Sequence, residues 1–254
     1  MDDLNISQYM YDWGRDLPPK IYKKISPSSI GGCQRKHWYS LKGAPITTPT
    51  NPGQILNMQT GFMWEKIITE SLQHAQIPFI SQWKMSSKKY NMEGTLDYGI
   101  LRGGELEIWD SKTESSLAKK YRNGSYLNSH EEYVDQLNCY AYMAREAGFT
   151  VTRGGFVVVR RDDSFIENFP FVFDEIRIAK TMAKVAKLQK NLEDNTLPPC
   201  DGKYCQIGLC EYGNPETRKE NAKGKLINSS CCGTPQEIKK WYEWRVENEN
   251  TSVA

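Results

Sequence analysis

The 254-residue sequence has no run of about 18 consecutive apolar residues, the length that a membrane-spanning helix needs. Its first twenty residues, MDDLNISQYMYDWGRDLPPK, lack the basic and apolar regions of a secretory signal peptide. It contains only three histidines, His37, His74 and His130, and their spacing is not that of metal ligands. These absences favour an intracellular protein without a membrane segment and argue against a metal site built from histidine.

Net charge is also small, because 33 lysines and arginines are balanced by 31 aspartates and glutamates. A near-neutral chain neither supports nor excludes nucleic acid as a partner, so any such surface needs local clusters of positive charge. The chain shows no internal repeat and no low-complexity tract. Its length allows one large domain with a small accessory module.

Hydrophobic periodicity predicts helices alternating with strands, which indicates an α/β protein with a mixed sheet. The expected long helices cover residues 54–74, 131–148 and 174–194, with a short helix over 28–43 and a last one over 235–248. The expected strands comprise two or three antiparallel ones within 79–113, and two more at 156–161 and 166–174.

Composition divides the chain into three parts. Residues 1–25 are expected to form an N-terminal arm, and residues 26–197, which include Cys33, the main core. Residues 198–254 are rich in cysteine and poor in core residues, and we expect them to pack back on the core.

The stretch EGTLDYGILRGGELEIWDSKTES, residues 93–115, carries two aspartates and a lysine on an expected β-hairpin. A turn at its Gly-Gly pair would bring Asp97 and Asp110 side by side. Asp110 and Lys112 are two residues apart, so on a strand both project from one face, whereas Glu107 projects from the other. This parity favours Asp110 over Glu107 as the second carboxylate of a site.

Two neighbouring carboxylates repel each other, and a hard divalent cation such as Mg²⁺ relieves that repulsion. A lysine beside them can orient or deprotonate an attacking water and stabilise the negative charge that develops on a phosphate. Asp97, Asp110 and Lys112 are thus the residue types that phosphodiester hydrolysis needs. Taken alone, the same pattern also fits an exposed hairpin with ordinary salt bridges.

Motifs in the two flanking helices extend this pattern. Gly61 and Glu65 lie in the preceding helix, and Gln136 and Tyr140 lie four residues apart on one face of the following helix. With the hairpin they form the series G-x-x-x-E, G-x-x-D, D-x-K and Q-x-x-x-Y across residues 61–140. In this order the sequence resembles the RecB-type branch of the PD-(D/E)XK nucleases. The resemblance implies a restriction-endonuclease-like α/β core, with a central mixed sheet flanked by helices.

The resemblance also implies a role for each motif residue. Asp97 and Asp110 would bind Mg²⁺ or Mn²⁺, joined by Glu65 either directly or through water. Lys112 would carry the catalytic role described above. The last motif, Gln136 and Tyr140, would hold the active site and the DNA backbone in register. Basic residues are the remaining candidates for contact with nucleic acid: Arg35, Lys119, Lys120, Arg122, Arg160 and Arg161.

The seven cysteines, in a presumed reducing compartment, are expected to be thiols or metal ligands rather than disulfides. Cys200, Cys205 and Cys210 follow one another at five-residue steps, and Cys231 and Cys232 follow after a polar stretch. Such clustering suits a tetrahedral Zn²⁺ or an iron–sulfur cluster, with free thiols in a loop as the third alternative.

The cysteine pattern resembles that of CRISPR-associated and AddB-like iron–sulfur exonucleases of the same superfamily. These place one cysteine before the nuclease core and three after it, a plan that Cys33, Cys200, Cys205 and Cys210 match. The resemblance implies a 4Fe–4S cluster that joins the two ends of the chain, with structural Zn²⁺ as the alternative. The spacing departs from the usual C-x2-C with a longer gap, so Cys231 or Cys232 could replace one ligand.

We therefore expect a Mg²⁺- or Mn²⁺-dependent deoxyribonuclease, acting as an exonuclease on single-stranded DNA or on DNA ends. The alternative is a nucleic-acid-binding adaptor subunit, with little nuclease activity of its own, in a replication, recombination or CRISPR adaptation complex. A compact nuclease of this kind fits an intracellular, cytoplasmic setting, with a virus or phage as a candidate source. No membrane partner is expected.

Overall fold

A computed structural model of the chain describes residues 9–10, 12–13, 22–48, 52–114, 126–200, 210–215, 218–220, 226–228 and 232–251. By their contacts these residues form two compact units. The sheet unit comprises the described residues of 24–31 and 58–189, and the cysteine unit comprises those of 1–23, 32–57 and 190–254.

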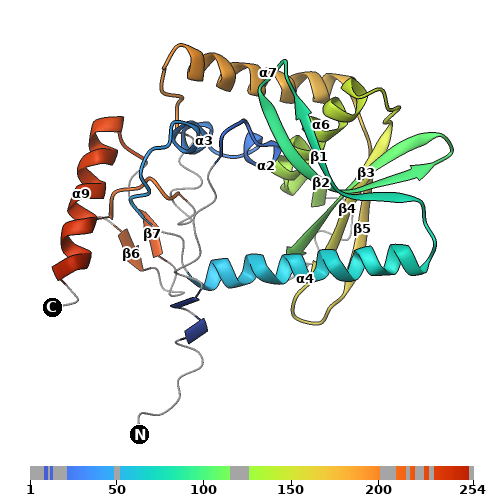
Figure 1. Ribbon diagram of the computed structural model, residues 1–254, viewed down its shortest axis with the longest axis horizontal. Helices are drawn as coiled ribbons and strands as arrows, with labels where there is room; N and C mark the ends of the chain where they lie inside the picture. The colour runs from blue at the N-terminus through green and yellow to red at the C-terminus, as the bar shows by residue number, and fades with distance from the viewer. Residues whose placement is uncertain are drawn as a thin grey trace, which may run out of the picture. The chain divides into compact units, whose positions relative to one another are not determined.

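The sheet unit is built around five strands in the spatial order β1-β2-β3-β4-β5 (Figure 1). These are β1 (Phe79–Ser87), β2 (Met92–Arg102), β3 (Glu105–Glu114), β4 (Arg153–Arg160) and β5 (Ile166–Val172). Strand β3 runs parallel to β4, and the other neighbours are antiparallel. The expected α/β fold with a central mixed sheet is therefore confirmed.

The turn between β2 and β3 has the predicted position, because Gly103 and Gly104 both adopt positive φ, +59° and +82°. Two such residues in succession match the right-handed twist of the flanking strands. The β2–β3 ladder runs from this turn to the pair Tyr98–Trp109 and ends there. Beyond that point β3 pairs only with β4, as far as Glu114. The two aspartates of the hairpin lie just past the end of the ladder.

Helices flank this sheet on both faces (Figure 1). Ile68 and Leu72 of α4 (Pro52–His74) line a cavity with Tyr98, on one face. On the other face, α6 (Glu131–Glu146) packs against β1 and β3. The remaining helices with residues in this unit are α2 (Pro27–Ile30), α5 (Tyr126–Ser129) and α7 (Glu175–Glu193). The long helices agree with the three predicted from apolar periodicity.

The core of the sheet unit lies between the sheet and α6. Leu137 and Ala141 of α6 are fully buried, as are Ile108, Phe156 and Val158 of β3 and β4. This apolar packing supplies most of the stabilisation of the fold, because each buried side chain of this size contributes roughly 1.5–3 kcal/mol. Asp110 stands in the same layer, so its charge is removed from water.

The prediction of one helix over residues 28–43 is wrong, because helix α2 ends at Ile30 and the helical conformation is interrupted there. A Cβ atom on Gly31 would lie 2.2 Å from Cα of Glu132, so the chain passes α6 too closely for any other residue. Helix α3 (Gln34–Leu41) starts afresh within the cysteine unit, with Cys33 as its N-cap rather than inside the helix.

The cysteine unit also contains the last predicted helix, α9 (Pro235–Thr251). A short antiparallel pair, β6 (Arg218–Glu220) with β7 (Leu226–Asn228), was not predicted, because three-residue strands leave no periodic signal. In the described part of the chain, every helix is too short or too polar to cross a membrane.

Candidate active site

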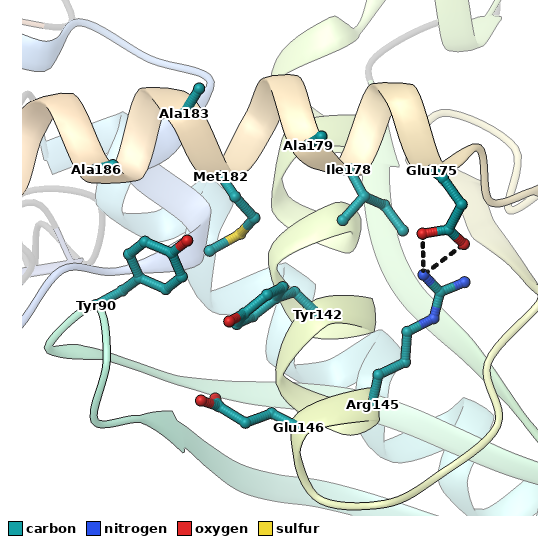
Figure 2. Close-up of a pocket in the computed structure, with 10 residues that line it drawn as sticks. All are labelled: Tyr90, Tyr142, Arg145, Glu146, Glu175, Ile178, Ala179, Met182, Ala183 and Ala186. Atoms are coloured by element: carbon teal, nitrogen blue, oxygen red, sulfur yellow. Dashed lines mark hydrogen bonds and ion pairs between the residues drawn. The ribbon is translucent and has the colours of Figure 1, made fainter.

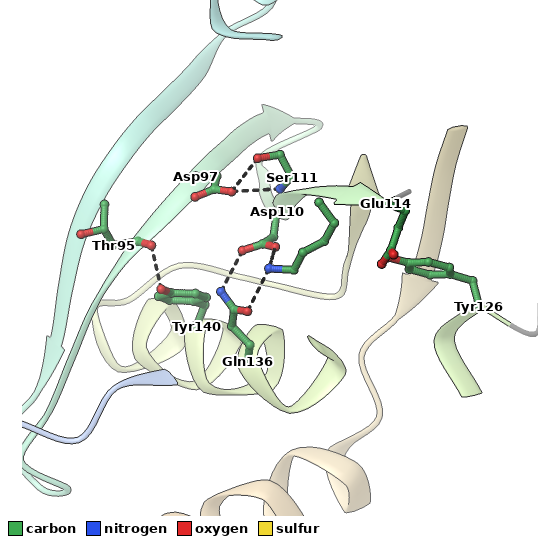
Figure 3. A network of polar contacts seen from close by, with 9 residues as sticks. Thr95, Asp97, Asp110, Ser111, Glu114, Tyr126, Gln136 and Tyr140 are labelled. Carbon is green, nitrogen blue, oxygen red and sulfur yellow. Dashed lines mark hydrogen bonds and ion pairs between the residues drawn. The ribbon is translucent and has the colours of Figure 1, made fainter. Parts of the chain in front are cut away.

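Asp97 lies on β2 one residue beyond the last β2–β3 pair. Its Oδ2 accepts two hydrogen bonds from Ser111 of β3, one from the main-chain nitrogen at 2.9 Å and one from the hydroxyl at 3.0 Å. The carboxylate therefore takes the place of a main-chain acceptor where the two strands part. This arrangement fixes the half-buried Asp97 side chain beside β3 (Figure 3).

Asp110 and Lys112 project from the same face of β3, as the strand parity predicts. The Asp110 side chain is buried, 1% exposed, and forms an ion pair with Lys112. Gln136 of α6 bridges the two, because its Nε2 donates to Oδ1 of Asp110 at 2.9 Å and its Oε1 accepts from Nζ of Lys112 at 3.1 Å. Nζ of Lys112 also lies 4.8 Å from the centre of the Tyr133 ring, a distance that favours a cation–π contact. Figure 3 shows this bridge between helix and strand.

Tyr140 stands one turn after Gln136, and its hydroxyl donates to the main-chain oxygen of Thr95 at 2.7 Å. Its side chain is buried, 3% exposed, so in this structure it supports β2 rather than facing solvent. Gly94 is required beside it, because a Cβ there would lie 2.9 Å from the Tyr140 hydroxyl and 2.8 Å from Pro27. Gly94 of the G-x-x-D motif and Tyr140 of the Q-x-x-x-Y motif therefore lie against each other.

Glu65 reaches the same region from α4. Its Oε2 accepts a hydrogen bond from Nε2 of Gln82 at 3.2 Å, and its main-chain oxygen accepts one from the Tyr98 hydroxyl at 2.8 Å. Gln82 lies on β1 between the pairs Ser81–Tyr98 and Trp83–Leu96, which places it opposite Asp97. The backbone of Gln82 is left-handed, with φ +50°, a conformation that costs a non-glycine residue roughly 1–2 kcal/mol.

Two of the three carboxylic acids, Glu65 and Asp110, have raised pKa values. Burial, followed by the charges of Asp97 and Asp110, raises the pKa of Glu65 to about 7. Burial raises the pKa of Asp110 to about 7 as well, with a further rise from Asp97 that Lys112 opposes. Clustered acids with raised pKa values mark functional sites more often than ordinary surfaces.

This donor set fits a divalent cation. Mg²⁺ and Mn²⁺ prefer carboxylate oxygens, and a bound cation would favour the charged form of both acids, whose pKa values are raised by burial first and by neighbouring carboxylates second. Within the described residues, no three potential ligand side chains are already gathered around one point. Hydrogen bonds from Ser111 and Gln136 hold the side chains of Asp97 and Asp110 in place, so these two carboxylates would be the first ligands of a bound metal ion.

Glu107, the competing carboxylate, lies on the opposite face of β3. It is buried, 3% exposed, and forms ion pairs with Arg153 at 3.0 Å and Arg102 at 3.7 Å. Trp109 donates to its Oε2 at 3.2 Å. Its charge is therefore balanced by two arginines on the face of β3 that does not carry Asp110 and Lys112.

Sequence reasoning missed Gln82, Tyr133 and the hydrogen bonds that the amide and hydroxyl of Ser111 donate to Asp97. Ser111 lies between Asp110 and Lys112, and this place within the D-x-K motif is the only feature of the sequence that points to it. The left-handed backbone of Gln82 has no sequence signal, since glutamine is not a residue that favours this conformation. Of the proposed nucleic-acid contacts, Lys119, Lys120 and Arg122 lie outside the described residues, and Arg160 forms an ion pair with Asp163.

A separate cavity of about 640 Å³ lies between α6, α7 and the β1–β2 turn (Figure 2). Ile178, Met182 and three alanines of α7 form much of its lining, and Arg145 pairs with Glu175 at one end, at 2.8 Å. None of the motif carboxylates lines it. The cavity is therefore distinct from the catalytic candidate.

In the cysteine unit, three of the cysteines approach one another. The sulfur of Cys200 lies 3.8 Å from that of Cys33 and 3.9 Å from that of Cys232. Cys210 is also buried, and the Thr48 hydroxyl donates to its main-chain oxygen at 2.9 Å. Cys205 and Cys231 lie outside the described residues.

Arg35 forms hydrogen bonds with two cysteine-bearing segments. Its Nε donates to the oxygen of Pro198 at 2.7 Å, and its Nη1 to the oxygen of Cys232 at 3.1 Å. The Tyr39 hydroxyl donates to Gly233, next to Cys232, at 2.5 Å. These bonds give Arg35 and Tyr39 of α3 a structural role around the cysteines.

Comparisons with known proteins agree with this architecture. The crystal structure of SSO0001 matches with a TM-score of 0.51 and 14% identity, over 82% of this chain and 93% of its own. The alkaline exonuclease LHK-Exo from Laribacter hongkongensis gives a TM-score of 0.46 and 11% identity, over 74% and 94%. Its complex with dAMP gives 0.47 and 12%, over the same shares. At these identities the likeness concerns the fold alone.

No curated protein is significantly similar to the chain in sequence. The sequence profile of the PD-(D/E)XK nuclease superfamily, however, matches residues 50–214, which include all four motifs and most of the sheet unit. The chain therefore belongs to the PD-(D/E)XK nuclease superfamily.

Proposed function

We propose that this protein is a Mg²⁺- or Mn²⁺-dependent deoxyribonuclease that hydrolyses phosphodiester bonds. One observation carries the proposal: Asp97, Asp110 and Lys112 meet where β2 and β3 part, and Gln136 holds the last two together. These groups combine two oxygen ligands for a hard cation with a cation that can face a phosphate.

In the proposed reaction, Asp97 and Asp110 hold the metal, and Glu65 binds it directly or through a water. A bound Mg²⁺ or Mn²⁺ supplies Lewis-acid stabilisation of the charge that develops on the phosphate. Lys112, the cation paired with Asp110, orients the attacking water and stabilises the negative charge that develops on the phosphate. Gln136 keeps Nζ of Lys112 and the Asp110 carboxylate at a set separation, and Tyr140 holds the strand that carries Asp97.

We further propose an exonuclease that acts on single-stranded DNA or DNA ends, as the RecB-type resemblance implies. The test is cleavage of 5′- and 3′-labelled single- and double-stranded DNA with Mg²⁺ or Mn²⁺. Progressive shortening from one labelled end is expected. Internal cleavage would overturn the exonuclease assignment, and binding without cleavage would support an adaptor subunit of a larger complex instead.

We propose that the cysteine unit holds a metal group through Cys33, Cys200 and Cys232, with Cys205 or Cys210 as the fourth ligand. The resemblance implies a 4Fe–4S cluster, and three buried or half-buried thiols in contact are suited to soft metals. The alternative is Zn²⁺. Thiolates about 2.3 Å from a tetrahedral ion lie about 3.8 Å from one another, close to the two separations from Cys200, 3.8 and 3.9 Å, although among the described residues no three side chains already surround one metal position.

This metal group also supports the proposed division of the chain into an N-terminal arm, a nuclease core and a cysteine-rich C-terminal segment. The metal group would fasten Cys33, before the main core, to the C-terminal segment, and Arg35 and Tyr39 would support it. Limited proteolysis with and without a chelator tests this role. We expect loss of the metal to expose the C-terminal segment to cleavage, and an unchanged cleavage pattern would contradict it.

A further inference from the structure

Helix α4 carries large apolar side chains that remain exposed to solvent. Met58, Phe62, Met63 and Ile67 are 59%, 58%, 66% and 44% exposed. An α-helix turns about 100° per residue, so Met58 and Phe62 lie within about 60° of Glu65 around the axis. Met63 and Ile67 lie on the other side, about 160° away. Two exposed apolar faces thus occur on one helix, and only one of them includes a catalytic candidate.

The face of α4 that carries Phe62 and Met58 also carries Glu65, which belongs to the carboxylate cluster. Glu65 points toward it, because Gln82, its hydrogen-bond partner at 3.2 Å, lies opposite Asp97 in the sheet. Phe62 stands one turn before Glu65, about 4.5 Å along the helix axis, and Met58 one turn further. A substrate whose phosphate lies at the carboxylates would therefore pass over Phe62.

We propose that Phe62, with Met58 beside it, is a stacking platform for unpaired bases of a single-stranded DNA substrate next to the cleaved phosphate. The inference rests on the proposed nuclease function and narrows its substrate to a single strand or a frayed end. An aromatic ring stacks on the face of any base, so the contact needs no particular sequence. In an intact duplex the same faces are covered by neighbouring base pairs.

Two features favour a base over other occupants. The platform is uncharged and lies one helix turn from the acidic side chain of Glu65, so a phosphate alone would gain nothing there. A protein docked on this face would cover Glu65 and block the catalytic cluster. The substrate itself is the partner that can occupy both places at once.

Binding tests this with Phe62→Ala, Phe62→Trp and, as the matched control, Met63→Ala, which removes an equally exposed side chain from the other face. Affinity for a labelled single-stranded oligonucleotide is measured in EDTA, beside an abasic oligonucleotide of the same length. We expect Phe62→Ala to weaken binding about tenfold, within the range known for base–aromatic stacking, and Phe62→Trp to retain it. The abasic oligonucleotide should bind Phe62→Ala and the unmodified protein equally, and Met63→Ala should behave as the unmodified protein.

The possible failures are distinguishable. If the protein cleaves DNA but Phe62→Ala binds normally, or loses affinity for the abasic oligonucleotide equally, the platform is excluded and the nuclease stands. A change from dimer to monomer in Phe62→Ala, seen by light scattering, would assign the face to a second copy of the chain. If the unmodified protein neither binds nor cleaves DNA, the proposed function fails and the platform fails with it.

Discussion

Ser111 donates both its main-chain N–H and its hydroxyl to a single oxygen of Asp97, at 2.9 and 3.0 Å. Asp97 thus replaces the main-chain acceptor that an unbroken β2–β3 ladder would supply. The strands part at this point without leaving the Ser111 amide unsatisfied.

Replacement of Ser111 tests this positioning. Ser111→Ala keeps the main-chain bond and removes the hydroxyl bond, so we expect cleavage to fall roughly three- to tenfold, the equivalent of about 1 kcal/mol. Ser111→Thr retains a hydroxyl and should keep more activity than Ser111→Ala. Initial rates over a range of Mg²⁺ concentrations provide the measurement, and the loss should be larger at low Mg²⁺. Equal rates for all three proteins would mean that the hydroxyl bond does not position Asp97.

Asp110→Ala and Lys112→Ala should each abolish most cleavage. We expect a loss of at least about two orders of magnitude, because each substitution removes a charge that would act on the reacting phosphate. Both variants should fold and still bind DNA, as checked by circular dichroism and by anisotropy. Glu93→Gln is the matched control, since it neutralises an exposed acid of the same sheet, which forms an ion pair with Lys24 at 2.7 Å. Undiminished Mg²⁺-dependent cleavage by both alanine variants would remove these residues from the mechanism.

The metal-free protein should become less stable as the pH rises from about 4 to about 7. Glu65 and Asp110 have pKa values near 7 in the folded state, through burial and mutual repulsion, against about 4 when unfolded. A raised pKa means that the fold favours the protonated acid, so its contribution is complete below the unfolded pKa and is lost as the pH passes the folded one. Melting temperatures in EDTA between pH 4 and 8 measure this.

Asp110→Asn serves as the control for that titration, because it removes one of the two groups. The fall in melting temperature toward pH 8 should be smaller in this variant than in the unmodified protein. Added Mg²⁺ should raise the melting temperature more at pH 8 than at pH 5, since protons compete with the metal for the same oxygens. Identical pH profiles for the two proteins would show that Asp110 does not titrate with a raised pKa.

Cys232→Ser should reduce the metal content of the purified protein, whereas Cys139→Ser should not. Cys232 lies 3.9 Å from Cys200 in the cysteine unit, whereas Cys139 is buried in α6 of the sheet unit. Elemental analysis for zinc and iron, with absorbance near 400 nm, distinguishes Zn²⁺ from a 4Fe–4S cluster. Full metal content in Cys232→Ser would exclude this cysteine as a ligand, and no metal in the unmodified protein would leave the thiols free.

Strand parity made much of the catalytic candidate predictable. Side chains alternate along a strand, so the spacing of Asp110 and Lys112 placed both on one face whatever the rest of the fold. A helix face repeats in the same way, and Gln136 and Tyr140 both turn toward the sheet. The prediction of a single helix over residues 28–43 was wrong because the chain approaches Glu132 closely at Gly31. This contact joins segments about 100 residues apart, so local sequence patterns do not reveal it.

From the amino-acid sequence alone it was possible to predict the order of the long helices and of the strands of the central sheet, the mixed α/β class, and the face of β3 that carries Asp110 and Lys112. These follow from local periods, which each segment carries within a few residues. Only the tertiary structure decided that Ser111 would hold Asp97, that Gln82 would adopt a left-handed backbone beside Glu65, and that Cys232 would join Cys33 and Cys200. Those contacts depend on how segments far apart in the sequence pack together, and the local periodicity of each segment carries no information about that packing.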